Sequence, residues 1–239
     1  MIFTIILSLI ILSPAVLSAP VAAALDVKSL ASISRTNLQT LASRLPQRCS
    51  VSNISVPLEG QAGLAVPAGQ TVSTIAVGRG VQNYTCTSGA YVSAGALANL
   101  FDVSCLFSMS SGFVDPQTVS GILPKMAFSS LSFPDAGRLP VAIHHQFVTT
   151  PGSATPGAIS PEFATTADKV VVSKVAAAAD PTDSAVNVPW LQLAAVEGQG
   201  TLSKSVFRLN TFNGQPPSSC TEEGEQLSVQ YASMYWFTS

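Results

Sequence analysis

Charged residues and histidine are both scarce in this chain of 239 residues. Only 10% of the positions carry Asp, Glu, Lys or Arg, and these give a net charge of −2 without forming blocks. Proteins that bind nucleic acid or an anionic membrane surface present a concentrated basic patch, which this composition does not supply. We therefore do not expect nucleic acid among the partners.

The sequence also lacks the residue spacings that bind metal ions. The only two histidines, His144 and His145, are adjacent, and neighbouring side chains on a strand point to opposite faces. No two cysteines have the C-x-x-C spacing of a zinc site. We expect no metal and no cofactor.

Catalytic motifs are missing as well. No Gly-x-Ser-x-Gly occurs, and Gly78-x-Gly80 has Asn83 where a dinucleotide-binding fingerprint requires its third glycine. Strand-forming residues follow, so we expect a glycine turn or bulge between two strands. The carboxylates could serve a glycosidase, but most lie beside Pro, Gly or Ser in expected loops. We assign no catalytic residue.

After residue 18, no stretch reaches the roughly 20 apolar residues that cross a bilayer. The preceding segment is apolar from Ile2 to Ile11 and then reaches Pro14 and the small pair Ser18-Ala19. This pattern predicts a signal peptide over residues 1–18. We therefore expect a secreted protein, extracellular or in a cell wall, that has no membrane partner after cleavage.

Two modifications fit an exported chain. The sequons at Asn53 and Asn83 predict N-glycosylation of a eukaryotic protein. An even number of cysteines in an oxidising compartment predicts two disulfides, and the residues alone leave three connectivities open. The four cysteines are Cys49, Cys86, Cys105 and Cys220.

We expect a helical segment over residues 19–48 and a single β-rich domain over residues 49–239. Asp26 can cap a helix whose apolar residues keep helical spacing as far as Leu45. Residues 94–102 are read as a helical turn or two, and residues 149–168 as a long surface loop. The expected strands are 54–58, 72–77, 81–85, 141–149, 169–175, 190–196, 205–211 and 227–237. This pattern is typical of an all-β fold, a mostly antiparallel β-sandwich or barrel, with an N-terminal helix.

Aromatic residues are few, at 7%, and they gather near the end of the chain. On a strand, Tyr231 and Tyr235 would face one side, while Met234 and Trp236 would face the other. We expect these side chains, and Trp190, to pack in a core. An exposed platform that stacks on sugar rings is the alternative.

A series of ordered motifs extends over nearly the whole chain after the expected signal. The motifs are Gly80-Val81-Gln82-x-Tyr84-x-Cys86, Leu100-Phe101-Asp102, His145-x-Phe147, Pro161-x-Phe163, Val188-Pro189-Trp190-Leu191-x-Leu193, Phe207-Arg208-Leu209-x-Thr211, Gly214-x-x-Pro217, Cys220 and Tyr231-Ala232-x-x-Tyr235-x-Phe237. Together they resemble a secreted family of unknown function, found in filamentous fungi and bacteria and often labelled malate dehydrogenase. The incomplete glycine fingerprint, the expected signal and the β-rich pattern all contradict that label.

The resemblance has consequences for the disulfides. Bacterial members keep cysteines only at positions 86 and 220, which implies the pairs Cys86–Cys220 and, by elimination, Cys49–Cys105. Shorter chain closure favours Cys86–Cys105 with Cys49–Cys220 instead. The chain departs from the family pattern in two places, a longer Pro/Ser/Thr loop after His145 and Asn213-Gly214 where two glycines are usual. Because of these departures, the resemblance predicts neither the local turn nor any loop-borne binding site in this chain.

These observations favour a non-catalytic extracellular or cell-wall-associated protein of unknown function, with a glycan as its candidate ligand. The alternatives are a hydrolase acting on an extracellular polysaccharide and a secreted effector that binds a host extracellular protein. Malate dehydrogenase activity is not expected. The candidate binding residues are His145, Tyr84, Gln82, Trp190 and Tyr235.

Overall fold

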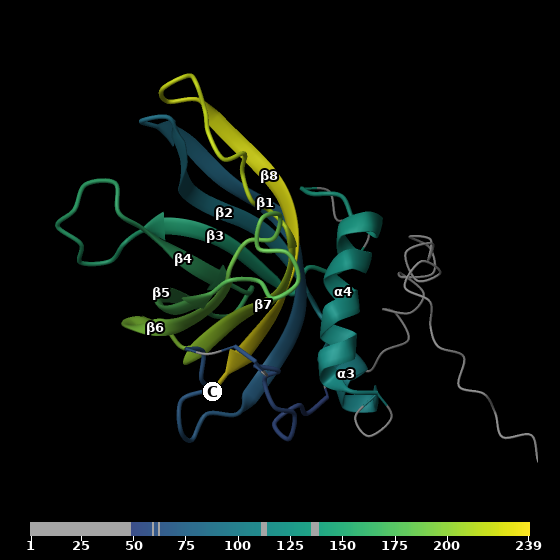
Figure 1. The fold of residues 1–239 in the computed structure, drawn as a ribbon. Helices are drawn as coiled ribbons and strands as arrows, with labels where there is room; N and C mark the ends of the chain where they lie inside the picture. Colours follow the sequence, from purple (N-terminus) through teal and green to yellow (C-terminus); the bar gives the residue numbers. More distant parts are fainter. Residues whose placement is uncertain (1–48, 59, 62, 111–113, 135–138) are drawn as a thin grey trace, which may run out of the picture.

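The computed structural model describes residues 49–239, apart from residues 59, 62, 111–113 and 135–138. The expected signal peptide and the expected helix within residues 19–48 lie outside this part, so both stay predictions. The described chain forms eight antiparallel strands closed into a barrel, with two helices packed outside it (Figure 1). The mostly antiparallel β fold is confirmed, and of the two expected architectures the barrel is the one present.

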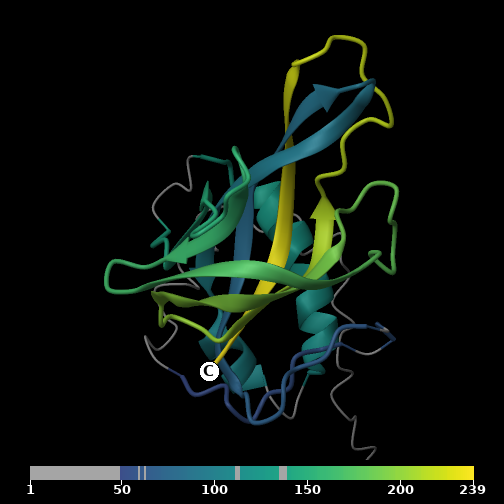
Figure 2. The ribbon, with the colours of Figure 1, turned by 90° about the vertical axis from the view of Figure 1, so that its left-hand side faces the viewer.

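The strands follow one another around the barrel in sequence order, and the last strand closes it against the first. The strands are β1 (Val72–Thr87), β2 (Ala90–Asp102), β3 (Ile143–Thr149), β4 (Ile159–Ala164), β5 (Lys169–Ala178), β6 (Trp190–Gly200), β7 (Ser205–Asn213) and β8 (Gln226–Thr238). The helices are α3 (Ser104–Ser110) and α4 (Pro116–Ser130). β1, β2 and β8 are the longest strands and extend beyond the rest of the barrel (Figure 2).

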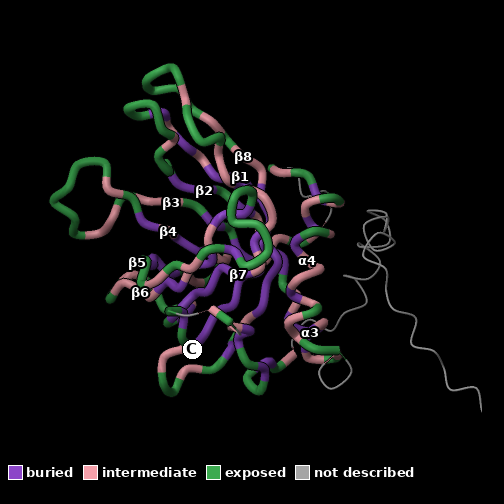
Figure 3. Tube along the Cα trace, in the orientation of Figure 1, coloured by how far each residue is buried: buried purple, intermediate pink, exposed green. Residues whose placement is uncertain are grey.

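The barrel wall supplies two apolar cores because successive side chains on a strand face opposite sides. Phe163, Val206 and Phe237 belong to the core inside the barrel. Met234 and Trp236 belong to a second core that also contains Phe107 and Ala127 of the helices. Buried residues accordingly follow the strand centres, while the connections are largely exposed (Figure 3). The expected alternation of side chains along β8 is confirmed.

Helix α4 covers the outer face of β1, β7 and β8. Its start is fixed by Asp115, whose carboxylate accepts a hydrogen bond of 3.0 Å from the Thr118 amide, and by Pro116 in the first turn. At its end, the Arg79 guanidinium of β1 donates to the Leu131 carbonyl over 3.1 Å. None of the helices in the described part of the chain has the length and hydrophobicity needed to span a membrane.

Strand β1 is one continuous strand, so the expected turn at Gly78 and Gly80 is wrong. A Cβ atom at Gly80 would overlap the Leu97 carbonyl oxygen and lie 2.6 Å from the Ala98 Cβ of β2. At Gly78 it would lie 2.6 Å from the Tyr235 ring of β8. The two glycines therefore allow neighbouring strands to approach, and no helix start follows them as nucleotide binding would require.

Three further expectations about local structure are wrong. Residues 94–102 belong to β2, where pairing with both neighbouring strands overrides the local propensity. Within the expected loop of residues 149–168, residues 159–164 form β4, paired with β3 and β5. Residues 54–58 pack on the outer core without joining the sheet.

The disulfides are Cys49–Cys105 and Cys86–Cys220, the pairs implied by the family resemblance. The first joins the start of the described chain to α3. The second fastens the connection between β7 and β8 to the projecting β1–β2 hairpin, where the Cys220 amide also donates to the Gly89 carbonyl over 3.0 Å. The alternative based on shorter chain closure is wrong.

The two sequon asparagines have different surroundings. Asn53 lies exposed in a turn. Asn83 is half-buried on β1, which pairs with strands on both sides, and its Oδ1 accepts a hydrogen bond of 2.7 Å from Ser228. Glycosylation of either residue stays a prediction.

Candidate binding site in the barrel interior

Six polar residues converge on the inside of the barrel, and we refer to them as the interior polar cluster. They are Gln82 and Tyr84 of β1, His145 of β3, Arg208 of β7, and Tyr231 and Tyr235 of β8. Four of the five binding residues expected from the sequence are among them. Trp190 is not, and Arg208 and Tyr231 are additions from the structure.

The strand register places these residues on a common face. Gly80 of β1 pairs with Tyr231 of β8 on one side and with Ala98 of β2 on the other, and Ala98 in turn pairs with His145. Directly paired residues share a face of the sheet, and residues two apart on one strand do so as well. Gln82 and Tyr84 therefore face inward with Gly80.

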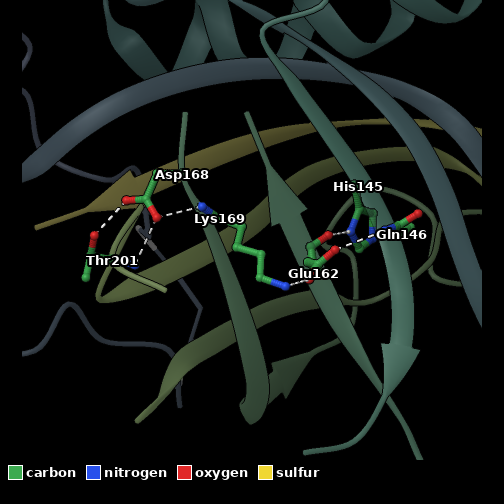
Figure 4. Close-up of polar contacts among 6 residues, drawn as sticks. All are labelled: His145, Gln146, Glu162, Asp168, Lys169 and Thr201. Atoms are coloured by element: carbon green, nitrogen blue, oxygen red, sulfur yellow. Dashed lines mark hydrogen bonds and ion pairs between the residues drawn. The ribbon is translucent and has the colours of Figure 1, made fainter. Parts of the chain in front are cut away.

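His145 is held as a neutral ring. It stacks on Phe163 at a centroid distance of 4.4 Å, and its Nδ1 lies 3.0 Å from the Glu162 carbonyl oxygen (Figure 4). Burial lowers the pKa of His145 to about 4, although the bond to Glu162 acts in the opposite direction. Because a carbonyl oxygen only accepts, Nδ1 carries the hydrogen and Nε2 is left as an acceptor.

The three tyrosines of the cluster also stay uncharged near neutral pH. Burial raises the pKa of Tyr84 to about 12, against the opposing influence of the Arg208 charge, and it raises the pKa values of Tyr231 and Tyr235. The Tyr84 hydroxyl donates to the Gly214 carbonyl over 2.8 Å. The hydroxyls of Tyr231 and Tyr235 lie 2.7 Å apart and bond to each other.

Gly214, which Tyr84 contacts, lies where the chain departs from the family pattern. A Cβ atom there would lie 3.0 Å from the Tyr231 Cβ and 3.4 Å from the Gln82 Cγ, so the interior polar cluster depends on a glycine at this position. Asn213 has a φ of 64°, a conformation that asparagine tolerates, and its side-chain Nδ2 donates to the Gln230 carbonyl over 2.8 Å. The turn is formed without the second glycine.

Arg208 is the cation of the interior polar cluster. Its inward direction follows from the register, because it pairs with Tyr235 and with Leu191, both of which pack in the interior core. One terminal nitrogen donates to the Pro189 carbonyl over 2.9 Å, and its Nε has no hydrogen-bond partner. Among the described residues the single ion pair joins Lys169 to Glu162, so no carboxylate balances Arg208.

Gln82 supplies a second unused donor. Its Nε2 is buried and makes no well-formed hydrogen bond within the described part of the chain, although the Gln82 side chain lies near the Tyr231 hydroxyl and acts against the rise in the pKa of Tyr231. Buried polar groups in folded proteins are nearly always hydrogen-bonded, and an exception calls for an explanation such as a ligand. Two such donors, on Gln82 and Arg208, occur in the same interior cluster.

The interior polar cluster retains some access to solvent. Gln82, Tyr84, His145 and Arg208 are between 5% and 8% exposed, whereas Phe163 of the interior core is 0% exposed. These four residues therefore lie nearer to solvent than Phe163, whereas Tyr231 and Tyr235, at 0% and 1% exposed, are as buried as the apolar core.

The carboxylates expected as acid–base candidates do not join this cluster. Glu162 accepts from Gln146 over 2.9 Å and from Lys169 over 2.8 Å, and the Lys169 bond is the main cause that lowers its pKa (Figure 4). Asp168 accepts from Thr201 over 2.7 Å, between two turns of the barrel (Figure 4). Neither carboxylate side chain contacts His145, whose partner is the main chain of Glu162.

Asp180 and Trp190 form a structural unit elsewhere. The Trp190 Nε1 donates to Asp180 over 2.8 Å, and the ring is buried in the outer core. Trp190 is therefore a core anchor, as expected, and does not lie with the other candidate binding residues. Trp236 and Tyr235 are at most 1% exposed, so the expected core packing of the terminal aromatics is confirmed.

A hollow of about 440 Å³ lies on the outside of the barrel at the end of α4. Arg79 and Gln230 line it together with residues 128–133. The Arg79 guanidinium sits 4.5 Å from the Phe128 ring centre and donates to the carbonyls of Leu131, Gly80 and Tyr231. Through these contacts, Arg79 joins α4 to the sheet.

The described residues contain no group of three or more His, Cys, Asp or Glu side chains able to hold a metal ion. His144 and His145 face opposite sides of β3, as expected: His144 is exposed and bonds to Asn99 over 3.1 Å, whereas His145 is buried.

The sequence carried a weak signal for the two residues it did not select. Arg208 interrupts the apolar run from Val206 to Leu209 on an expected strand, and a charge in such a run is unusual. Tyr231 shares the expected face of Tyr235. What the sequence could not show is that these faces meet inside a closed barrel.

The fold and its interior define an antiparallel β-barrel protein with a candidate ligand site of one cation, neutral donors and a neutral histidine. The chain belongs to the family described as protein of unknown function (DUF3455), whose model matches residues 67–239. That match covers all eight strands and assigns no activity. Nothing among the curated proteins or the solved structures matches the chain.

Proposed function

We propose that this protein is a secreted, non-catalytic binding protein of the extracellular space or cell wall, which holds a glycan-derived ligand at the interior polar cluster. The observation that carries the proposal is the pair of buried donors without partners, on Arg208 and Gln82. Sugar hydroxyls are acceptors that satisfy such donors, and Nε2 of the neutral His145 accepts from a hydroxyl in return.

Secretion is supported by the apolar segment of residues 1–18 and by the two disulfides, which persist in oxidising compartments. The barrel type is compatible with this proposal, because the interior of an eight-stranded barrel is either filled by side chains or holds one small ligand. Neither the hydrolase nor the effector alternative gains a specific observation from the described residues.

The test is calorimetric titration of the disulfide-bonded protein with monosaccharides and short oligosaccharides from plant and fungal walls. We expect saturable binding that Gln82→Met weakens at least about tenfold, the equivalent of one lost hydrogen bond. Gln230→Met is the matched control, because Gln230 lines the outer hollow and its Oε1 also lacks a partner. Absence of binding across the panel, or equal losses in both variants, would overturn the proposal.

A further inference from the structure

Arg208 is a buried positive charge without a negative charge beside it. The residue is 8% exposed, and among the described residues no acidic side chain forms an ion pair with it. Removing a charge from water costs several kcal/mol unless a counter-charge and hydrogen bonds compensate. Within the described ranges, the Pro189 carbonyl is the one hydrogen-bond acceptor of its guanidinium, and this carbonyl carries no charge.

The neighbours of Arg208 cannot supply the missing negative charge. Tyr84, Tyr231 and Tyr235 all keep their protons at physiological pH, because burial raises their pKa values. His145 is neutral and has no negative form in this range. The interior polar cluster therefore holds one uncompensated positive charge.

From this we propose that the ligand of the interior polar cluster carries a carboxylate, which pairs with the Arg208 guanidinium. The inference rests on the proposed function and names the chemical class of its ligand. Guanidinium is planar and presents its donors as a fork that matches the two oxygens of a carboxylate. The unused Nε of Arg208 is one donor of that fork, and the Gln82 amide is a further donor for the rest of the ligand.

A carboxylate fits better than a phosphate. Arg208 is the only cation among the six members of the interior polar cluster, so a single negative charge is balanced and a doubly charged phosphate is not. The carboxylate has two sources, a uronic acid from a wall glycan or a small free organic acid. Both present the same group to Arg208.

Matched pairs of ligands separate these possibilities. Calorimetry on the full disulfide-bonded chain compares galacturonate with galactose, glucuronate with glucose, and both uronates with lactate and inorganic phosphate. We expect each uronate to bind at least about tenfold more tightly than its neutral partner, as for a charge-assisted hydrogen bond. Tighter lactate than uronate binding would assign the site to a free organic acid, with the role of Arg208 unchanged.

The outcomes also separate this inference from the proposed function. Equal affinity for galacturonate and galactose would overturn the inference of a carboxylate ligand and leave the proposal of a glycan-binding barrel. Tighter binding of phosphate than of any carboxylate would overturn the inference as well. No binding of any ligand would overturn both.

Variants of Arg208 test whether its charge serves binding or folding. Arg208→Met is expected to abolish the preference for uronates and to unfold thermally at or above the temperature of the unchanged protein without ligand, because a buried uncompensated charge is removed. Lys174→Gln on the exposed face of β5 is the control for loss of one positive charge. A preference that survives in Arg208→Met would overturn the inference.

Arg208→Lys covers the case in which the methionine variant does not fold. It keeps the charge and loses the planar fork, so we expect uronate affinity to fall about tenfold while the fold is retained. Unchanged affinity in Arg208→Lys would overturn the assignment of the carboxylate to the guanidinium fork.

Discussion

Arg208 and His145 are polar residues whose side chains lie in surroundings unlike water. Both are buried in the barrel, one as a cation without a counter-charge and the other as a neutral ring. If these two residues served packing alone, apolar side chains of similar size, such as those of Phe163 and Val206, would do so at a lower cost in folding free energy. These two environments are the basis of the ligand site that we propose.

His145 predicts how stability depends on pH. Its pKa of about 4 in the folded protein lies below the usual 6.5, so as the pH falls between these values the unfolded chain takes up a proton that the folded chain does not. We expect urea denaturation to show a loss of about 3 kcal/mol in unfolding free energy from pH 7 to pH 4 that is due to His145. In His145→Phe this part of the loss should vanish. His144→Phe, at the exposed neighbour, should retain it, and an identical pH profile in both variants would contradict the account.

Gly80 predicts a steric effect. Replacement by Ala places a Cβ against the Leu97 carbonyl and the Ala98 side chain, both on a paired strand that cannot move independently. We expect Gly80→Ala to lower the unfolding free energy by about 2 kcal/mol or more, measured by chemical denaturation. Gly121 of α4 has open space around it, so Gly121→Ala should be neutral or stabilise by about 0.5–1 kcal/mol. Equal effects of the two substitutions would show that close strand approach is not the reason for Gly80.

The sequence could predict which side chains share a face of the sheet, because this depends only on the alternation of side chains along a strand. Gln82 and Tyr84 share a face in any extended chain, and the same reasoning separated Tyr235 from Trp236. It selected four residues that do meet inside the barrel. Arg208 was passed over because its significance lies in the absence of a carboxylate nearby, which is a property of three-dimensional packing.

At the scale of elements, β1 organises the barrel because it pairs with β2 and β8 over most of its length. The turn expected at its glycines was wrong because glycine was interpreted as a turn former. In β1 glycine instead allows close packing. The β1–β2 turn at Ser88 and Gly89 has φ angles of 53° and 81°, typical of a tight hairpin. Ser88-Gly89 is thus a turn signal in the sequence, but it was not recognised as the turn between the two long strands.

Strand β4 and helix α4 show the limits of local patterns more clearly. β4 contains Pro161 and Glu162, both poor strand formers, and its existence depends on pairing with β3 and β5. α4 contains Pro124, which normally interrupts a helix. In both elements tertiary contacts outweigh the preferences of single residues.

The connection between β5 and β6 depends on Asp180. Its carboxylate accepts from Asn187 over 3.1 Å, from Trp190 over 2.8 Å and from Thr211 over 3.0 Å. Burial alone would raise its pKa, yet these and further hydrogen bonds together lower it to about 2, below the usual 3.8. Stability from Asp180 is therefore present above pH 3.8 and lost as the pH falls towards 2.

We expect Asp180→Asn to lower the unfolding free energy by about 2–3 kcal/mol at pH 7, because an amide presents a donor to groups that need an acceptor. Thermal and urea unfolding measure this. Asp183→Asn, at an exposed carboxylate of the same connection, is the control and should change stability by less than about 0.5 kcal/mol. A neutral Asp180→Asn would mean that the connection is held by its apolar contacts.

At the scale of the whole molecule, the barrel is a closed ring of strands with a helical layer on one side and a disulfide-fastened extension at one end. The β class was predicted from composition and short strands, with a sandwich and a barrel as the alternatives. The sequence could not choose between them, because closure depends on β8 returning to β1, a pairing between distant residues that no local pattern records. The interior site is a product of that closure.

The disulfide Cys86–Cys220 is expected to stabilise the fold as a whole by constraining the unfolded chain, and in addition to hold the projecting end closed. Replacing both cysteines by serine should lower the unfolding free energy by about 2–5 kcal/mol. Hydrogen exchange should accelerate most in residues 214–225 and in the β1–β2 hairpin, which the Cys86–Cys220 bridge joins. The matching replacement of Cys49 and Cys105 should leave exchange there unchanged. Equal acceleration in the barrel and at the projecting end in the first variant would contradict this additional effect.

The most direct test of the interior site is an NMR titration that follows the side-chain N–H signals of Arg208 and Gln82. With galacturonate, we expect the Arg208 Nε–H and the Gln82 Nε2 signals to shift together and to saturate at one ligand per chain. The Arg79 Nε–H signal, in the outer fastening to α4, should not move. Saturating shifts at Arg79, with Arg208 and Gln82 unchanged, would contradict the account.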